Sequence, residues 1–133
     1  MLRSLRSLFY CAVLLVPVLG CEVEDDHREH GTATGATCPT TGSTLNYQNF
    51  GQGFMTAYCT RCHSSALTGA SRQSAPSGLD FDTVNGVRAN RDLIDLHAAA
   101  GPDAVNSAMP PSAPTPTDAD RRRLGEWLAC GAP

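Results

Sequence analysis

The chain contains no lysine, so all ten of its basic residues are arginine, and thirteen acidic residues give it a formal net charge of −3. Aromatic residues make up only 6% of the sequence, with a single tryptophan. Proteins that bind nucleic acid neutralise phosphates with a surplus of basic residues, and this chain has none. We therefore expect no nucleic acid partner.

The sequence also lacks the common patterns of catalysis. It has no Ser–His–Asp pattern, no glycine-rich phosphate loop and no convincing pair of carboxylates. Strand-like alternation of apolar and polar residues is weak throughout. These absences favour an all-α domain and leave its chemistry to its few cysteines, histidines and methionines.

The most specific motif is Cys-Thr-Arg-Cys-His at residues 59–63. Cys-x-x-Cys-His is the pattern of covalent c-type haem attachment. The thiols of Cys59 and Cys62 add to the two vinyl groups, and His63 becomes the proximal ligand of the iron. The motif predicts one covalently bound haem c.

Three alternatives to haem exist for a Cys-x-x-Cys pair. A thioredoxin-like dithiol needs a βαβ context, and no strand-like run precedes Cys59. A zinc site needs a second ligand pair, whereas Cys38 and Cys130 stand alone at the two ends of the domain. A second structural disulfide would make the chain a haem-free binding or structural protein. The adjacent His63 favours haem.

The N-terminus has the pattern of an export signal. Arg3 and Arg6 precede an apolar run over residues 8–19 that is short for a membrane-spanning helix. The sequence Val-Leu-Gly-Cys ending at Cys21 resembles a bacterial lipoprotein signal, which predicts a signal peptide at residues 1–20 and lipidation of Cys21. The alternative is an ordinary cleaved signal or an uncleaved anchor. Haem thioethers are made outside the bacterial cytoplasm, so export and the haem motif agree.

Residues 21–37 are acidic and then small and polar, which predicts a flexible tether. Glu22, rather than Asp, follows the lipidation site and favours the outer membrane or the periplasmic face of the envelope. His27 and His30 lie in this tether, where we interpret them as solvated residues instead of metal ligands.

Residues 38–133 are expected to form one small helical domain. Aromatic residues spaced by three and four predict a helix over residues 46–58 that leads into the haem motif. Residues 84–100 are amphipathic and predict two short helices. Thr117 is a good N-cap for a last helix with an apolar face of Leu124, Trp127 and Leu128.

The order of helix, Cys-x-x-Cys-His, variable loops, Met-Pro and final helix resembles the small class I cytochrome c fold, as found in surface lipoproteins of myxobacteria and planctomycetes. The resemblance implies that the first and last helices cross, with Gly51 against Trp127. It departs from the family at Met55, which stands where an aromatic residue is usual, and at Ser64, which replaces a glycine.

The resemblance further implies that Met109, followed by two prolines, supplies the distal thioether to iron. Paired prolines stiffen the loop that would carry it. His97 is the competing ligand and would give a lower potential. If neither binds, the iron is five-coordinate, which would suit a peroxidase or a sensor of small ligands.

The two cysteines left over, Cys38 and Cys130, lie next to helices that should pack together, and an exported chain should oxidise them to a disulfide. Two buried free thiols are the alternative. The arginine run at residues 121–123 is interpreted as the solvated face of a helix, with docking of an acidic redox partner or pairing with haem propionates as the alternative. Together these features predict a monomeric, membrane-tethered, monohaem electron carrier, not an enzyme, that serves unidentified redox proteins of the envelope.

Overall fold

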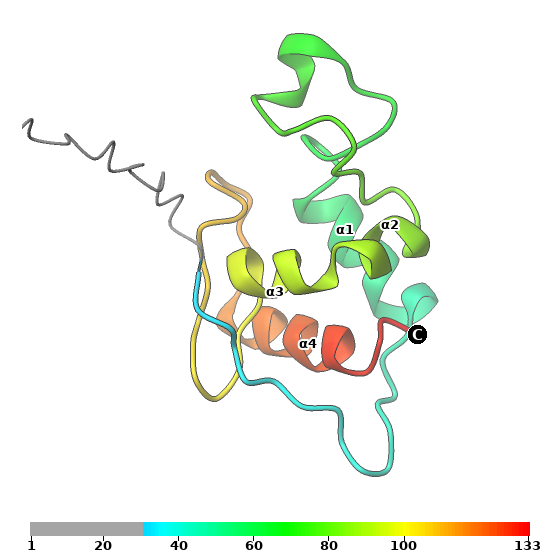
Figure 1. Cartoon of the computed structure of the whole chain (residues 1–133), viewed down its shortest axis with the longest axis vertical. Coiled ribbons are helices and arrows are strands. Elements are labelled where there is room, and N and C mark those ends of the chain that lie inside the picture. Colours follow the sequence, from blue (N-terminus) through cyan, green and yellow to red (C-terminus); the bar gives the residue numbers. More distant parts are fainter. Residues whose placement is uncertain (1–30) are drawn as a thin grey trace, which may run out of the picture.

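The computed structural model describes residues 31–133. The predicted signal peptide, Cys21, His27 and His30 lie outside the described residues. Within the described part, all the regular secondary-structure elements are helices, and one isolated β-bridge joins Ala100 to Val105. The all-α class is therefore confirmed (Figure 1). The elements in chain order are η1 (Tyr47–Gly51), α1 (Gln52–Tyr58), η2 (Gly69–Arg72), α2 (Val84–Ala89), α3 (Arg91–Ala98) and α4 (Asp118–Ala129).

The helix predicted before the haem motif is present as η1 followed directly by α1. Asn46 starts it with a capping box, because its side chain accepts from the amide of Asn49 while the Asn49 side chain accepts from the Asn46 amide. The first turns are a π-helix, in which the amide of Gly51 reaches the carbonyl of Asn46 at 3.1 Å. Phe50 and Phe54 are buried on its apolar stripe, as their spacing indicates.

The last helix also agrees with the sequence. The Thr117 hydroxyl accepts from the amide of Asp120 at 3.1 Å and caps α4. Leu124, Trp127 and Leu128 are buried on one face. These three residues belong to the hydrophobic core, and α3 packs against α4.

The two terminal helices approach each other closely at Gly51. A Cβ atom at this position would lie 2.4 Å from two ring carbons of Trp127. A side chain here would therefore push the indole out of the core, and only glycine permits the contact. This confirms the predicted pairing of Gly51 with Trp127.

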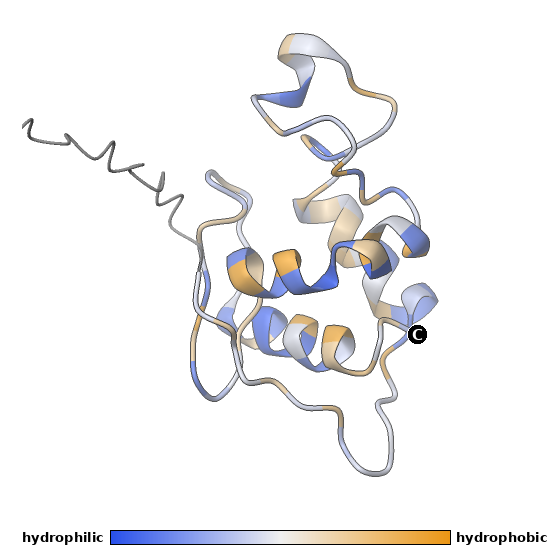
Figure 2. Ribbon diagram, viewed as in Figure 1, coloured by the Kyte–Doolittle hydropathy of each residue, from blue (hydrophilic) through white to orange (hydrophobic). Residues whose placement is uncertain are grey.

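The amphipathic stretch after residue 83 forms the two expected short helices, α2 and α3. Thr83 caps α2 through its hydroxyl, and α3 packs against α4. Figure 1 shows α3 above α4 and the long loop before α2 projecting from the top of the molecule. Figure 2 shows hydrophobic and hydrophilic residues in short blocks along both helices, as expected for elements that bury one face.

The predicted disulfide between Cys38 and Cys130 is present, with the two Cα atoms 4.7 Å apart. It joins the segment before η1 to the end of α4. Gly131 follows with a φ of 87° and ends the helix. Among the described residues, no helix has both the length and the apolar character to cross a membrane.

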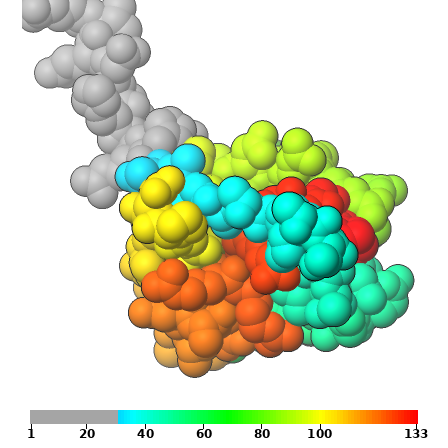
Figure 3. All heavy atoms as spheres, turned by 90° about the horizontal axis from the view of Figure 1, so that it is seen from below, coloured from blue at the N-terminus to red at the C-terminus, as the bar shows by residue number. Residues whose placement is uncertain are grey.

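The predicted tether was wrong at its C-terminal end, because residues 31–37 pack on the domain. Thr34 is 1% exposed, and its amide and hydroxyl both donate to the carboxylate of Asp95 on α3. The amide of Asp103 donates to the Thr34 carbonyl at 2.9 Å. Figure 3 shows this cyan segment lying across the red helix α4. The small, polar residues of this segment predict a tether, because composition does not reveal contacts that are made mainly by backbone and hydroxyl groups.

Candidate functional site

The Cys-x-x-Cys-His motif forms a turn at the end of α1. The amides of Cys62 and His63 reach the carbonyl of Cys59 at 3.1 and 3.0 Å, which winds the chain tightly. Both thiols are free, in contrast to the disulfide cysteines. The turn therefore presents two thiols and an imidazole from five consecutive residues.

A cavity of about 250 Å³ brings the predicted haem residues together. Cys59, Cys62 and His63 line it from the motif, and His97 and Met109 line it from α3 and from the loop before α4. The remaining lining is largely apolar and includes Leu79, Phe81, Leu93, Ile94, Pro110 and Pro111. A set of two thiols, an imidazole and a thioether in an apolar cavity fits the chemistry of haem c.

The imidazole of His63 is held in a defined tautomer. Its Nδ1 lies 3.0 Å from the carbonyl oxygen of Leu79, and a carbonyl can only accept, so Nδ1 carries the proton. The lone pair is consequently on Nε2. The ring stacks on Phe81 with centroids 4.8 Å apart. Burial is the largest cause that lowers the pKa of His63, which keeps the ring neutral and able to bind a metal.

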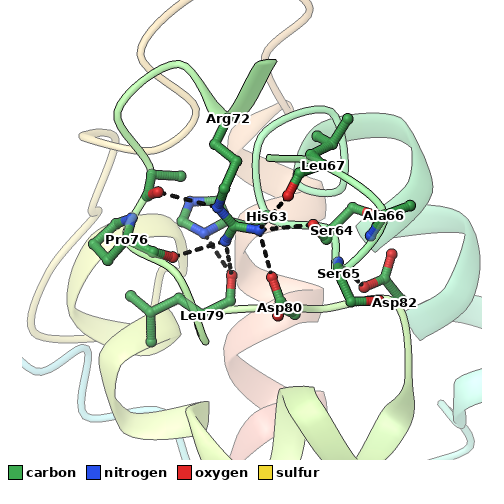
Figure 4. Close-up of polar contacts among 11 residues, drawn as sticks. His63, Ser64, Ser65, Ala66, Leu67, Arg72, Pro76, Leu79, Asp80 and Asp82 are labelled. Carbon is green, nitrogen blue, oxygen red and sulfur yellow. Dashed lines mark hydrogen bonds and ion pairs between the residues drawn. The ribbon is translucent and has the colours of Figure 1, made fainter. Parts of the chain in front are cut away.

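Arg72 lies next to His63 and organises the loop that follows it in the chain (Figure 4). Its guanidinium pairs with Asp80 at 2.8 Å and donates to the carbonyls of Ser64 and Pro76, both at 2.7 Å. It also donates, at 3.3 Å, to the Leu79 carbonyl that accepts from His63. The sequence does not reveal this role, because Arg72 lies in a polar stretch with no periodic signal and only the folded loop buries it.

The Cys59 thiol is buried, and burial raises its pKa to about 12. Such a thiol is protonated near neutral pH, unlike the activated thiolate of a thioredoxin-like dithiol. Within residues 31–133, no three side chains from His, Cys, Asp or Glu lie close enough together to hold a metal ion. The thioredoxin-like and zinc alternatives therefore gain no support from this site.

Met109 lines the cavity but is 41% exposed. Its amide donates to the carbonyl of His97 at 2.8 Å, so the two candidate distal ligands are joined through the backbone. The geometry brings both residues to the same cavity as His63. The sequence left open which of them would bind, and the structure presents both.

The predicted solvated face of α4 was wrong for Arg121, which is only 3% exposed. Its Nη1 donates to the carbonyls of Ala98, Asn106 and Met109. Arg122 and Arg123, in contrast, are exposed. A run of three arginines suggested one solvated surface, but the helical turn of 100° per residue points the first of them inward.

Arg61, inside the motif, connects it to the loop that carries Met109. Its guanidinium donates to the carbonyl of Ala113 at 2.6 Å and to the carbonyl of Ser112. The Nε atom of Arg61 is buried and has no hydrogen-bond partner. This contact holds the motif and the Met-Pro-Pro loop as neighbouring walls of the cavity.

A larger hollow of about 510 Å³ lies between residues 33–36, α3 and α4. It is lined by Arg91, Asp92 and Asp95 but contains no cysteine, histidine or methionine. Size alone would favour this hollow. We assign the site to the smaller cavity, because only that one contains groups able to attach and ligate a haem.

Comparison with known proteins identifies no relative. No protein family, no curated protein and no solved structure matches the chain. The assignment of a function therefore depends on the residues and their geometry.

Proposed function

We propose that this chain is a monohaem c-type cytochrome that carries single electrons in the bacterial cell envelope. The observation that supports it best is that Cys59, Cys62, His63 and Met109 line one apolar cavity. The fold in this proposal is the small class I cytochrome c fold, which agrees with the contact between Gly51 and the indole of α4.

Each residue has a task in this function. Cys59 and Cys62 would hold the haem by thioethers, and His63 would offer Nε2 to the iron while the Leu79 carbonyl accepts a hydrogen bond from its Nδ1. Met109 would offer its thioether as the second ligand. A bound haem would supply an iron that alternates between the ferrous and ferric states.

The apolar wall adds control over the potential. Leu79, Phe81, Ile94 and the prolines after Met109 give the cavity a largely apolar lining, which would reduce the access of water to a bound haem. A dry environment penalises the more highly charged state of a redox centre, so this lining raises the reduction potential. Methionine as a ligand acts in the same direction.

The proposal includes export, lipidation at Cys21 and action as a monomer that exchanges electrons with other envelope redox proteins. Two or more acyl chains anchor a protein stably. A Cys21→Ser variant should move from the membrane fraction to the soluble periplasmic fraction, with the haem spectrum unchanged as its control. Membrane retention of that variant would contradict lipidation at Cys21.

The decisive experiment is an optical spectrum of the full chain made with the haem maturation machinery, oxidised and reduced, with and without carbon monoxide. We expect sharp low-spin c-type bands, a weak far-red sulfur-to-iron band when oxidised, and no shift with carbon monoxide. The Cys59→Ser/Cys62→Ser double variant is the control and should carry no covalent haem. A wild-type chain without haem would overturn the proposal.

A second candidate is a five-coordinate haem protein that binds small ligands or peroxide. The 41% exposure of Met109 favours it, because an exposed loop residue is easily displaced. A high-spin spectrum that shifts with carbon monoxide would select this alternative.

A further inference from the structure

Arg121 is a buried cation without a carboxylate partner in the described part of the chain. Its side chain is enclosed at the start of α4, and none of the ion pairs among residues 31–133 includes it. Burying a charge is costly unless hydrogen bonds compensate it. Because Arg121 is buried, it does not contribute to the solubility of the surface. Its role is therefore to be found in the hydrogen bonds that its guanidinium donates.

Those contacts all involve the chain between α3 and α4. The Nη1 atom lies 2.7 Å from the carbonyl of Ala98, 2.9 Å from that of Asn106 and 2.8 Å from that of Met109. In addition, the Arg121 carbonyl accepts from the amide of Ala100 at 2.9 Å. One residue of α4 therefore fixes the end of α3 and the Met109 backbone relative to each other.

The segment fixed in this way, from Ala98 to Met109, includes one candidate distal ligand and directly adjoins the other. His97 precedes Ala98 directly, and its carbonyl accepts from the Met109 amide. The chain has no lysine, and His63 and His97 are its two histidines within residues 31–133. His97 lines the same cavity as Met109. If the Met109 thioether left the iron, the His97 imidazole would be the histidine within residues 31–133 that could replace it.

We propose that Arg121 is a positioning residue that selects Met109 over His97 as the distal ligand. This inference rests on the proposed haem function. A thioether binds ferric iron more weakly than an imidazole, so Met109 must be held in place to compete. Arg121 supplies this by reducing the freedom of a loop whose ligand side chain is otherwise exposed.

The test compares four holoproteins: wild type, Arg121→Gln, Arg121→Gln/His97→Asn, and Arg122→Gln as the matched control. Arg122 is exposed, and within residues 31–133 its guanidinium makes one long hydrogen bond, to the Gly101 carbonyl at 3.3 Å. The measurements are the far-red sulfur-to-iron band, the spin state and the midpoint potential. Far-ultraviolet circular dichroism checks that each variant is folded.

We expect Arg121→Gln to lose most of the far-red band, to stay low-spin and to have a lower potential, because His97 replaces Met109. The double variant should be high-spin, since among residues 31–133 no histidine other than His63 then lines the cavity to replace the thioether. Arg122→Gln should match wild type. A folded Arg121→Gln with wild-type band and potential would overturn the inference, and so would a double variant that stays low-spin.

Arg121→Lys provides a second test if the glutamine variant does not fold. A lysine keeps the charge but cannot reproduce the planar fork of donors, so the far-red band should be partly lost. A wild-type band and potential in this variant would contradict the inference. The wild-type spectrum separates the two hypotheses, because absence of haem or of the far-red band there counts against the proposed function itself.

Discussion

The two walls of the cavity are held by different means. The wall that carries His63, here called the proximal wall, consists of the loop over residues 64–82, which folds around Arg72 and its ion pair with Asp80, and the His63 ring itself is hydrogen-bonded and stacked. The wall that carries Met109, here called the distal wall, is held by Arg121, which donates to three backbone carbonyls, while the Met109 side chain remains exposed.

In the proposed cytochrome, His63 would be the fixed ligand and Met109 the exchangeable one. The His63 ring is itself hydrogen-bonded and stacked, so its orientation survives small movements of the loop. Met109 is held through its backbone. We therefore expect perturbations on the proximal side to affect haem retention and stability, and perturbations on the distal side to affect ligand identity.

The largest contrast should come from removing each ligand. His63→Leu should yield little correctly ligated haem, because the motif loses the imidazole that binds the iron as the thioethers form. Met109→Leu/His97→Asn, which removes both candidate distal ligands, should keep its covalent haem but become high-spin and bind carbon monoxide. Haem staining of denaturing gels and carbon monoxide difference spectra measure the two effects. Equal loss of covalent haem in both variants would abolish the contrast.

The next effect is on stability and concerns the proximal wall. Arg72→Met leaves Asp80 unpaired and several carbonyls without a donor, which should cost about 3 kcal/mol in the free energy of unfolding. Urea denaturation measures this. Arg91→Met is the control: its pair with Asp92 is exposed, and its loss should change stability by less than about 0.5 kcal/mol.

A smaller loss is expected on the distal wall from Asn106→Ala. Its Nδ2 donates to the carbonyls of Thr32 and Asp95 at 2.7 and 2.8 Å, and it is 9% exposed. Losing both bonds should cost about 1–2 kcal/mol. Hydrogen exchange should show faster opening around residues 99–109 than around 64–82. The exposed Asn85 supplies the control substitution, and faster exchange on the proximal loop instead would contradict the comparison.

The smallest expected effect is on the stability of the protein at acidic pH. Hydrogen bonds from the Ser64 hydroxyl and the Ser65 amide lower the pKa of Asp82. A carboxyl group with a lowered pKa in the folded state stabilises the protein above its unfolded pKa, and this contribution is lost as the pH falls through the folded value. Because Asp82 is exposed, the effect should stay below about 1 kcal/mol.

Asp82→Asn should therefore flatten the acid limb of a stability profile between about pH 5 and pH 2. An unchanged slope in the Asp82 variant would show that the Ser64 and Ser65 contacts do not affect the acid stability.

The helices could be predicted because their signals are local. The spacing of Phe50 and Phe54, the cap at Thr117 and the glycine after Cys130 each depend on a few neighbouring residues, and all have the expected structure. The grouping of Cys59, Cys62, His63 and Met109 around one cavity also agrees with the motif and the family resemblance.

The two arginines that hold the walls could not be predicted in the same way. Arg72 is buried by carbonyls up to eight residues away along an irregular loop, and Arg121 by carbonyls from a preceding segment. Neither contact leaves a periodic or compositional trace. Thr34 escaped notice for the same reason, since its partners Asp95 and Asp103 lie more than sixty residues further along the chain.

The disulfide between Cys38 and Cys130 encloses every residue that lines the cavity, since its two ends are 92 positions apart. The site therefore lies on a covalently closed ring. A protease that cuts the projecting loop over residues 64–82 once would leave two fragments that remain linked, so the nicked protein would separate on a gel only after reduction. A single backbone break in this loop would not release either wall of the cavity from the other.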